Sequence, residues 1–236
     1  MKAPTSHAIR LILPILLVPS CLHAAPTVEG KKKVSCEQVA DGIWCIRLGM
    51  PEDLTPTRFR SGPIQTESLK QMGGPKEPPI QAADIQFFAS PRGCAVTLPM
   101  SAKEHIYELG LSARGFDKTN TRQKLIPSDN PEVEGGPSHA PVPFYVSTEG
   151  YGVFVDTARY ASFNIGNTSP LETATAAAAG GVALSTEDLY KARTLSKRNM
   201  LIDIPAAQGV DIYIFAGPQM MDAVRRYNLC DLSGQL

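Results

Sequence analysis

The stretch V-P-F-Y-V-S-T-E-G-Y-G-V-F-V-D-T-A-R-Y-A-S-F-N-I, residues 142–165, decides the fold of this chain. Two runs of aromatic and β-branched residues, 142–147 and 151–156, flank the turn sequence T-E-G at 148–150, which predicts a β-hairpin. Bulky apolar residues occupy both alternating faces of the second run, a pattern typical of a strand covered on two sides within a sandwich. A third run, 159–165, follows closely and predicts that the hairpin continues as a meander.

Runs of apolar and β-branched residues bounded by Gly and Pro turn signals recur on both sides of this stretch. They predict further strands at residues 34–40, 43–48, 85–89, 94–98, 201–204 and 210–215. We expect Trp44 in the core or stacked on an edge of the sandwich. The predicted fold is therefore all-β, an antiparallel β-sandwich with one or two short helices near its C-terminal end.

Two segments near the C-terminal end carry helix signals. Residues 219–229 follow Pro218 and place basic side chains near their end, which favours a helix. Its inner stripe is expected to consist of Met221, Val224 and either Tyr227 or Asn228. The motif S-T-E-D at residues 185–188 is similar to a capping box and predicts a short solvated helix up to about residue 198.

Three connecting segments lack the composition of regular structure. Residues 50–79 are rich in Pro and polar residues, which argues against a helix or a central strand. Residues 105–143 contain a long connection, and a loop of this length in a compact domain is usually functional or disordered. The Ala-, Gly- and Thr-rich residues 168–181 indicate a surface insertion.

The N-terminal residues have the composition of an export signal. Basic residues precede an apolar run at 11–18, and Ala24 supplies the small residue that a signal peptidase requires. The run is too short to span a bilayer core of about 30 Å. We expect a signal peptide at residues 1–25, a domain at residues 26–236, and a periplasmic or extracellular location. An alternative is that Cys21 is lipidated, which would anchor the protein to a membrane.

Charge and motif content exclude several classes of function. Lys and Arg number 23 and Asp and Glu number 23, so the formal net charge is zero. A chain without excess basic charge is a poor partner for nucleic acid or for an anionic membrane surface. The sequence contains no Cys/His cluster with metal-ligand spacing and no phosphate-binding Gly loop, so neither a metal nor a cofactor is expected.

Export would permit disulfides among the cysteines that follow the signal segment. Cys36 and Cys45 flank a D-G turn signal, and pairing across it would set Gln38 opposite Cys45. The two cysteines would then be diagonal neighbours on one face, an awkward geometry for a bridge, so the bridge is an alternative and not the expectation. Cys94 and Cys230 are expected to be buried free thiols.

Two segments resemble a known family. The sequence P-F-Y-V-S-T-E-G-Y-G-V-F-V-D-T-A-R-Y at residues 143–160 resembles the signature hairpin in the N-terminal β-sandwich of glycoside hydrolase family 31, the retaining α-glycosidases and α-xylosidases. The sequence D-I-Y-I-F-A-G-P-Q-M-M-D-A-V-R-R-Y-N-L at residues 211–229 resembles the closing part of that sandwich. The resemblance implies a galactose mutarotase-like fold, a short strand at 57–60, a carbohydrate partner of α-glucoside or α-xyloside type, and a catalytic barrel in cis or in trans.

The resemblance also implies a substrate-binding loop. The family's Y-G-L-G-E or Y-G-F-G is similar to H-I-Y-E-L-G at residues 105–110, where Glu108 stands in place of a usual Gly. The following loop of the family supplies an Asp to the sugar subsite, and Asp129 is the matching position. We therefore expect Asp129 to accept hydrogen bonds from sugar hydroxyls, with Asp117 and Phe116 as further substrate-binding candidates. The alternative is that Asp129 forms an Asx-turn and Phe116 closes a small core.

No catalytic residue is assigned. In the family the nucleophile and the acid/base belong to the barrel, and no barrel sequence follows Leu236. We therefore expect a non-catalytic domain, or a truncated form, of a secreted family 31 α-glycosidase that braces the barrel. The alternatives are a free-standing carbohydrate-binding module and an aldose 1-epimerase-like enzyme. In the latter, the acid and base would come from His105 or His139 and from Glu108 or Glu134.

Overall fold

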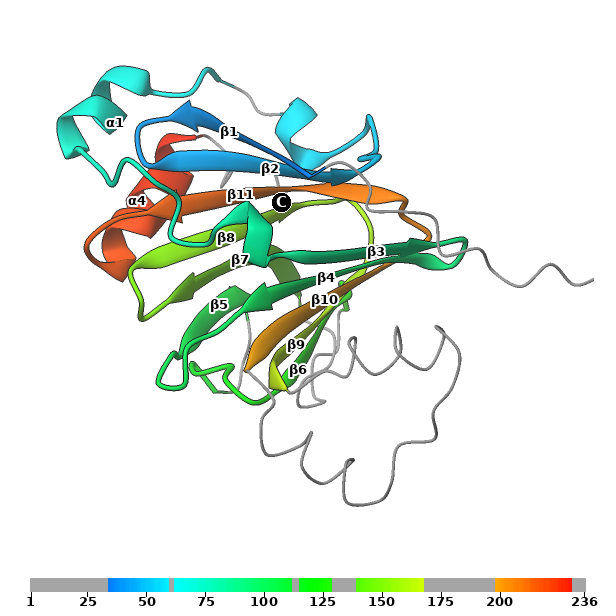
Figure 1. The fold of residues 1–236 in the computed structure, drawn as a ribbon. Coiled ribbons are helices and arrows are strands. Elements are labelled where there is room, and N and C mark those ends of the chain that lie inside the picture. The colour runs from blue at the N-terminus through cyan, green and yellow to red at the C-terminus, as the bar shows by residue number, and fades with distance from the viewer. Residues whose placement is uncertain (1–33, 60–61, 112–114, 129–138, 168–197, 231–236) are drawn as a thin grey trace, which may run out of the picture. The chain divides into compact units, whose positions relative to one another are not determined.

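The computed structural model describes five parts of the chain, residues 34–59, 62–111, 115–128, 139–167 and 198–230. Within them, eleven antiparallel strands form two sheets that lie face to face (Figure 1). The predicted antiparallel β-sandwich is therefore confirmed. The predicted signal segment, the Ala-rich segment and the helix expected from residue 185 lie outside the described residues.

The two sheets differ in the number and order of their strands. Sheet A has six strands in the spatial order β1 (Ser35–Ala40), β2 (Ile43–Gly49), β11 (Gly209–Ala216), β8 (Tyr151–Asp156), β7 (Ala140–Ser147) and β5 (Ile106–Leu111). Sheet B has five strands in the order β3 (Gln86–Ser90), β4 (Gly93–Pro99), β10 (Asn199–Pro205), β9 (Ala161–Asn167) and β6 (Arg122–Leu125). Every strand run predicted from the sequence corresponds to one of these strands.

The main hydrophobic core fills the space between the sheets. From β8, the side chains of Tyr151, Val153 and Val155 enter this core, and each is at most 5% exposed. The intervening residue, Phe154, is 1% exposed and belongs to a different core on the outer face of sheet A. Both faces of β8 are therefore covered, as the absence of polar alternation in its sequence predicts.

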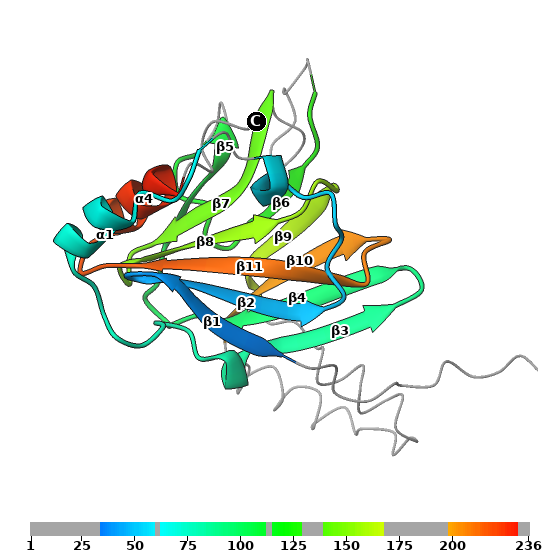
Figure 2. The ribbon, with the colours of Figure 1, turned by 90° about the horizontal axis from the view of Figure 1, so that it is seen from above.

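The second core lies between sheet A and helix α4 (Met220–Leu229). Phe144 of β7 stacks on Tyr227 of α4 with ring centroids 4.0 Å apart and an interplanar angle of 8°. Phe215 of β11 meets the same tyrosine ring edge-on at 5.7 Å. A short helix, α1 (Thr66–Met72), lies alongside α4 and adds the fully buried Leu69 (Figure 2).

The turn between β7 and β8 requires a glycine. Gly150 has a φ of +83°, and a Cβ at this position would lie 2.6 Å from the carbonyl oxygen of Gly217. Neither the backbone conformation nor the space suits another residue. The hairpin predicted from T-E-G is therefore confirmed.

The predicted meander is wrong. β9 pairs with β10 and β6 in sheet B and does not pair with β8. The chain therefore crosses from one sheet to the other at residues 157–160, and this crossing forms a corner at one end of the sandwich. Tertiary packing, and not the local sequence, decides which sheet a strand joins.

The expected register of the first hairpin is also wrong. A bulge between Gln38 and Ala40 shifts the pairing, so that Glu37 lies opposite Cys45 and Cys36 lies opposite Ile46. A shift by one residue exchanges the two faces of a strand, so Cys36 and Cys45 point to opposite sides of sheet A. Cys36, Cys45 and Cys94 carry free thiols, and both Cys94 and Cys230 are buried as expected.

Two connections contain more regular structure than their composition suggests. The Pro-rich segment 50–79 forms α1 and a 3₁₀ turn, η1 (Pro56–Phe59), where the resemblance implies a strand. The expected loop after His105 forms β5 and, further on, β6. A further 3₁₀ turn, η2 (Ala82–Asp84), precedes β3.

Helix α4 begins as predicted after Gln219, whose side chain and that of Asp222 form a reciprocal capping box. The predicted inner stripe is wrong in part, because Met221 is 56% exposed and the buried residues are Ala223, Arg226 and Tyr227. Arg226 is 1% exposed because its guanidinium donates to the backbone carbonyls of Asp41, Gly73 and Asp222.

None of the helices among the described residues is long and apolar enough to pass through a membrane.

Candidate functional site: an aromatic cleft at the end of the sandwich

A cleft of about 360 Å³ lies at the corner where β8 leads into β9. Its walls come from η1, from this corner, from the residues that follow β6, and from the start of β7. Four prolines contribute to the lining: Pro56, Pro127, Pro141 and Pro143. Because a proline ring leaves few backbone conformations open, these walls are rigid before any ligand binds.

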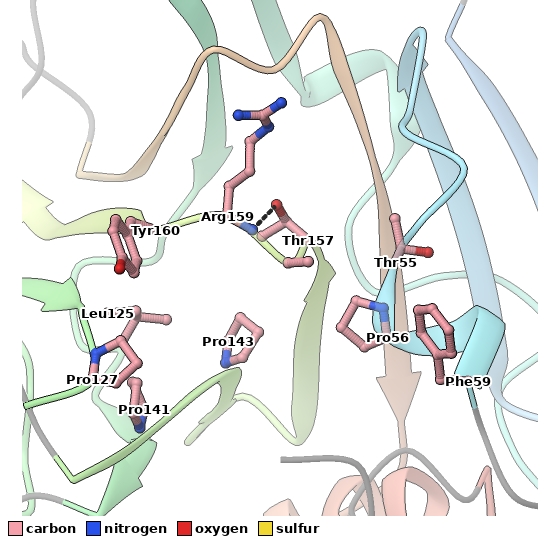
Figure 3. A pocket seen from close by; sticks show the side chains of 11 residues that line it. Thr55, Pro56, Phe59, Leu125, Pro127, Pro141, Pro143, Thr157, Arg159 and Tyr160 are labelled. Carbon is pink, nitrogen blue, oxygen red and sulfur yellow. Dashed lines mark hydrogen bonds between the residues drawn. The ribbon is translucent and has the colours of Figure 1, made fainter.

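Two exposed aromatic rings border the cleft. Phe59 at the end of η1 is 64% exposed, and Tyr160 just before β9 is 61% exposed. The two rings stand at opposite ends of the cleft, with Pro143 and Pro56 between them (Figure 3). These exposed rings make this end of the sandwich a candidate binding surface.

The buried carboxylate of Asp156 fixes the position of η1. Asp156 ends β8 and is 3% exposed. The Thr55 hydroxyl donates to its Oδ2 at 2.8 Å, and the Thr57 backbone N–H donates to its Oδ1 at 3.1 Å. The Thr57 hydroxyl donates to Oδ2 as well. Because Thr55 and Thr57 flank Pro56, these bonds hold one wall of the cleft against the end of β8.

An ion pair attaches the same connection to the β8–β9 corner. Arg159 donates from Nε and from Nη2 to Oε1 of Glu52, at 2.8 Å and 2.5 Å. Together with the bonds to Asp156, this pair ties the segment after β2 to the corner at two points. The groups that form these contacts are about a hundred residues apart in the sequence. The cleft therefore forms only when the whole domain has folded.

The carboxylates near the cleft are already engaged. Burial raises the pKa of Asp156, while hydrogen bonds from Thr57 and Thr55 lower it and the neighbouring Asp211 raises it further. Asp211 lies directly opposite Asp156 on β11 and receives two hydrogen bonds from Arg47, at 2.9 Å and 2.8 Å. Neither carboxylate lines the cleft.

The described residues that line the cleft are mostly apolar. Its lining consists of Pro, Thr, Ala, Leu, Arg and the two aromatic residues, and contains no Asp, Glu, His or Cys from the described part of the chain. Retaining hydrolysis of a glycoside requires two carboxylates about 5 Å apart on either side of the bond. The described residues also contain no group of three or more potential metal ligands.

None of the predicted substrate-binding residues is seen to line the cleft, and one of them lies outside the described residues. Asp129 is not among the described residues. Phe116 is 92% exposed and Asp117 accepts a hydrogen bond from the backbone N–H of Thr119 at 2.8 Å, but neither lines the cleft. The expectation that Phe116 could close a small core is wrong.

Asp117 pairs with a histidine. Nδ1 of His105 lies 2.7 Å from Oδ2 of Asp117. Burial acts to raise the pKa of Asp117, but hydrogen bonds from Thr119 and His105 outweigh it, so the pKa is lowered overall. The pair joins the start of β5 to the loop that precedes β6.

Two observations bear on the acid and base of the epimerase alternative. His105 is paired with Asp117 and not with Glu108, and neither His105 nor His139 lines the cleft. Glu134 lies outside the described residues. Glu108 instead marks backbone strain, because it and Leu109 have φ angles of 82° and 75°.

Sequence reasoning missed Phe59, Tyr160 and the two threonines that bond to Asp156. Tyr160 and Asp156 belong to the hairpin sequence that carries the family resemblance, which was the available signal. Nothing local marked the segment T-P-T-R-F, residues 55–59, because its partners are more than 90 residues away along the chain.

Comparison with solved structures identifies similar folds. A GH31 dextranase of Flavobacterium johnsoniae, in complexes with isomaltotriose and with glucose, matches at 12% identity with a TM-score of 0.52. The match covers 85% of this chain and 26% of the dextranase chain, so this chain spans about a quarter of that enzyme. The cycloalternan-forming enzyme of Listeria monocytogenes, in complex with a pentasaccharide substrate, matches at 11% identity with a TM-score of 0.47. It covers 83% of this chain and 19% of that enzyme.

Comparison by sequence gives the family. No curated protein matches the chain significantly. Residues 53–164 match the family described as the glycosyl hydrolase 31 N-terminal galactose mutarotase-like domain. This range contains η1, the β7–β8 hairpin and the corner that forms the cleft. The two-sheet fold agrees with that match. Within residues 53–164, the chain is therefore similar to the glycosyl hydrolase 31 N-terminal galactose mutarotase-like domain.

Proposed function

We propose that this chain is the non-catalytic N-terminal domain of a secreted family 31 α-glycosidase, where it braces a catalytic barrel and lends a loop to the substrate pocket. The observation that carries the proposal is the end of the sandwich described above. It presents exposed aromatic rings and a rigid cleft, but no acid or base from the described residues lines that cleft. We propose that this surface holds a partner and that the barrel supplies the catalytic carboxylates.

The place of the predicted loop supports the same proposal. Pro127 and Pro141, which stand on either side of the segment that contains Asp129, both line the cleft. The described residues that flank this segment therefore lie at the end of the sandwich that carries the exposed aromatics. We propose that Asp129 accepts hydrogen bonds from a sugar held in the barrel of the complete enzyme, since a carboxylate can accept from two neighbouring hydroxyls.

Exposed apolar side chains on the same connection support contact with another protein surface. Met50 and Leu54 are 63% and 70% exposed, and neither lines the cleft. Both precede η1 on the segment that Asp156 and Arg159 hold in place. A large interface with a barrel would cover these side chains, as apolar side chains usually are in permanent assemblies.

The test compares the chain alone with the chain joined to a barrel. The whole chain is assayed with p-nitrophenyl α-glucoside, p-nitrophenyl α-xyloside and isomaltotriose, and we expect no product. The barrel that we expect to be encoded beside it is then produced with and without residues 26–236. We expect the barrel alone to lose solubility or most of its activity. Hydrolysis by the chain alone, or a fully active barrel without it, would refute the proposal.

The assembled enzyme also tests Asp129. We expect Asp129→Ala to lower kcat/KM by roughly 10- to 100-fold, because a hydrogen-bonded charged group in a binding site contributes about 1.5–3 kcal/mol. Asp84→Ala serves as the matched carboxylate control, since Asp84 is exposed in η2 and does not line the cleft. An equal loss in both variants would argue against a special role for Asp129.

Export is a separate part of the proposal. We propose that residues 1–25 are removed on secretion, or that Cys21 is lipidated. Mass spectrometry of the protein recovered from the exported fraction distinguishes the two, because cleavage near Ala24 leaves an unmodified N-terminus and lipidation leaves a diacylglyceryl group on Cys21. Recovery of the intact, unprocessed chain in the cytoplasm would contradict both.

A further inference from the structure

We propose that the aromatic cleft is a binding site for a neutral oligosaccharide, whose sugar rings stack on Phe59 and Tyr160. The choice of saccharide as ligand class rests on the proposed function. The choice of the site rests on the size, charge and exposed groups of the cleft.

The size of the cleft fits a small ligand. Its volume of about 360 Å³ falls at the lower end of the range for small-molecule sites, about 300–1,000 Å³. A cleft of this volume can hold one or two sugar rings.

The charge of the cleft fits a neutral ligand. Arg159 is the one charged residue among those that line the cleft in the described part of the chain. Its guanidinium is neutralised by two short hydrogen bonds to Glu52. A phosphate or carboxylate ligand would have to compete with Glu52, and a cationic ligand would meet the guanidinium. A neutral polyol avoids both costs.

The exposed groups fit the two kinds of surface on a sugar. The axial C–H groups of a pyranose form an apolar face, and aromatic rings such as those of Phe59 and Tyr160 can pack against it. The hydroxyls need hydrogen-bond partners. A guanidinium has five N–H donors, and the bonds to Glu52 use those on Nε and one on Nη2, which leaves donors for hydroxyls. The Tyr160 hydroxyl can both donate and accept.

Contacts within the chain hold the walls of the cleft in place. η1 is held by the bonds from Thr55 and Thr57 to Asp156, and the opposite wall is built from prolines. A ligand that enters loses its own freedom but does not need to order the protein. Because the protein then loses little conformational entropy on binding, even a weakly interacting ligand such as a sugar can bind.

The experiment is calorimetric titration of the whole chain with isomaltotriose, maltotriose and a xyloglucan heptasaccharide. We expect one of them to bind with a Kd in the millimolar range or below. Phe59→Ala and Tyr160→Ala are expected to weaken that binding by on the order of tenfold each, and Tyr160→Phe by less. Leu111→Ala is the matched control, because the apolar side chain of Leu111 is 66% exposed and does not line the cleft, and it should bind like the wild type.

Two results would overturn the inference. One is the absence of binding for all three saccharides at millimolar concentrations, and the other is binding that Phe59→Ala and Tyr160→Ala leave unchanged. Circular dichroism establishes that the variants are folded, as expected for side chains that are more than 60% exposed. A dimer detected by light scattering that either substitution dissociates, without saccharide binding, would assign the cleft to a second copy of the chain instead.

The outcome is separable from that of the proposed function. If the chain restores a barrel but binds no saccharide in the cleft, the site inference fails and the proposed function stands. If the chain binds saccharide through Phe59 and Tyr160 but no barrel depends on it, the proposed function fails and the chain acts as a carbohydrate-binding module.

Discussion

At the scale of single residues, Asp156 couples the stability of the domain to pH. Burial raises its pKa, and Asp211 opposite it adds to this effect, against the hydrogen bonds from Thr57 and Thr55 that lower it. When the folded-state pKa of a carboxyl group is raised, ionisation costs stability at every pH above that pKa. This cost fades as the pH falls through the raised pKa towards the ordinary value of about 3.9.

Replacing Asp156 isolates this contribution. Asp156→Asn keeps the shape and some of the hydrogen bonds but does not titrate. We expect the wild type to gain stability relative to Asp156→Asn as the pH falls from about 7 to about 4. Urea unfolding of both proteins at a series of pH values measures the difference. A difference in free energy that does not change with pH would contradict the assignment.

Glu108 stores backbone strain that a glycine would relieve. It has a φ of 82° at a bulge in the pairing of β5 with β7, and its side chain is exposed. A left-handed conformation costs a residue with a Cβ roughly 1–2 kcal/mol. A glycine would remove this cost. Glycine also has more conformational freedom in the unfolded chain, and this entropy offsets part of the stability gained.

We therefore expect Glu108→Gly to raise the free energy of unfolding by about 0.5–1 kcal/mol, measured by urea denaturation. Leu109→Gly is the matched comparison, because Leu109 has a similar φ of 75° but a side chain only 4% exposed in the main core. Loss of that packing should outweigh the relief of strain and destabilise the domain. A destabilised Glu108→Gly variant would show that the Glu108 side chain has a favourable role.

At the scale of elements, one side chain joins helix α4 to two loops. Arg226 donates to the carbonyls of Asp41, in the β1–β2 turn, and of Gly73, which caps α1. Desolvation lowers its pKa, although Asp222 and Asp41 act in the opposite direction. Its removal would leave these carbonyls without their partner and open a cavity next to Gly42.

We expect Arg226→Ala to destabilise the domain by about 3 kcal/mol. Arg225→Ala is the control on the same helix, since the Arg225 side chain is 64% exposed and makes only a long contact to Asp222. That change should cost less than about 0.5 kcal/mol. Thermal unfolding of both variants provides the measurement, and equal melting temperatures would mean that α4 is not held through Arg226.

The elements that the sequence predicts well are those whose signals are local. The β7–β8 hairpin follows from its apolar runs and from the need for Gly150. α1 was missed because its seven residues lie within a Pro-rich segment, and it depends on burial of Leu69 against α4 rather than on propensity. The sequence of β9 also does not predict which sheet the strand joins, because its residues would suit either sheet.

The candidate site was less predictable than the fold. Thr55 and Asp156 are 101 residues apart in sequence, and their contact exists only after both sheets have formed. Asp117 was identified from its loop, but its pairing with His105 could not be foreseen, since the sequence predicted a loop where β5 begins. A bulge of one residue also places Cys36 and Cys45 on opposite faces of sheet A, although the sequence predicted that they share one face. Long-range contacts and single-residue register shifts leave no periodic pattern to read.

At the scale of the whole molecule, the central strands of sheet A contribute to both cores. On β11, Ile214 packs in the main core and its neighbour Phe215 packs in the core beneath α4, and both are fully buried. The strand cannot lose contact with one core without disturbing its residues in the other. We therefore expect sheet B, sheet A and α4 to unfold as one cooperative unit.

Hydrogen exchange tests this cooperativity. β4 borders only the main core and α4 only the second core, so their amides report the two cores separately. We expect Ile214→Ala to cost about 3 kcal/mol and Phe215→Ala about 4 kcal/mol. Each substitution should lower the opening free energies of the slowest amides in β4 and in α4 by the same amount. If Phe215→Ala accelerated exchange in α4 alone, the helix would unfold independently of the sandwich, and a partner docked on that face could then control it separately.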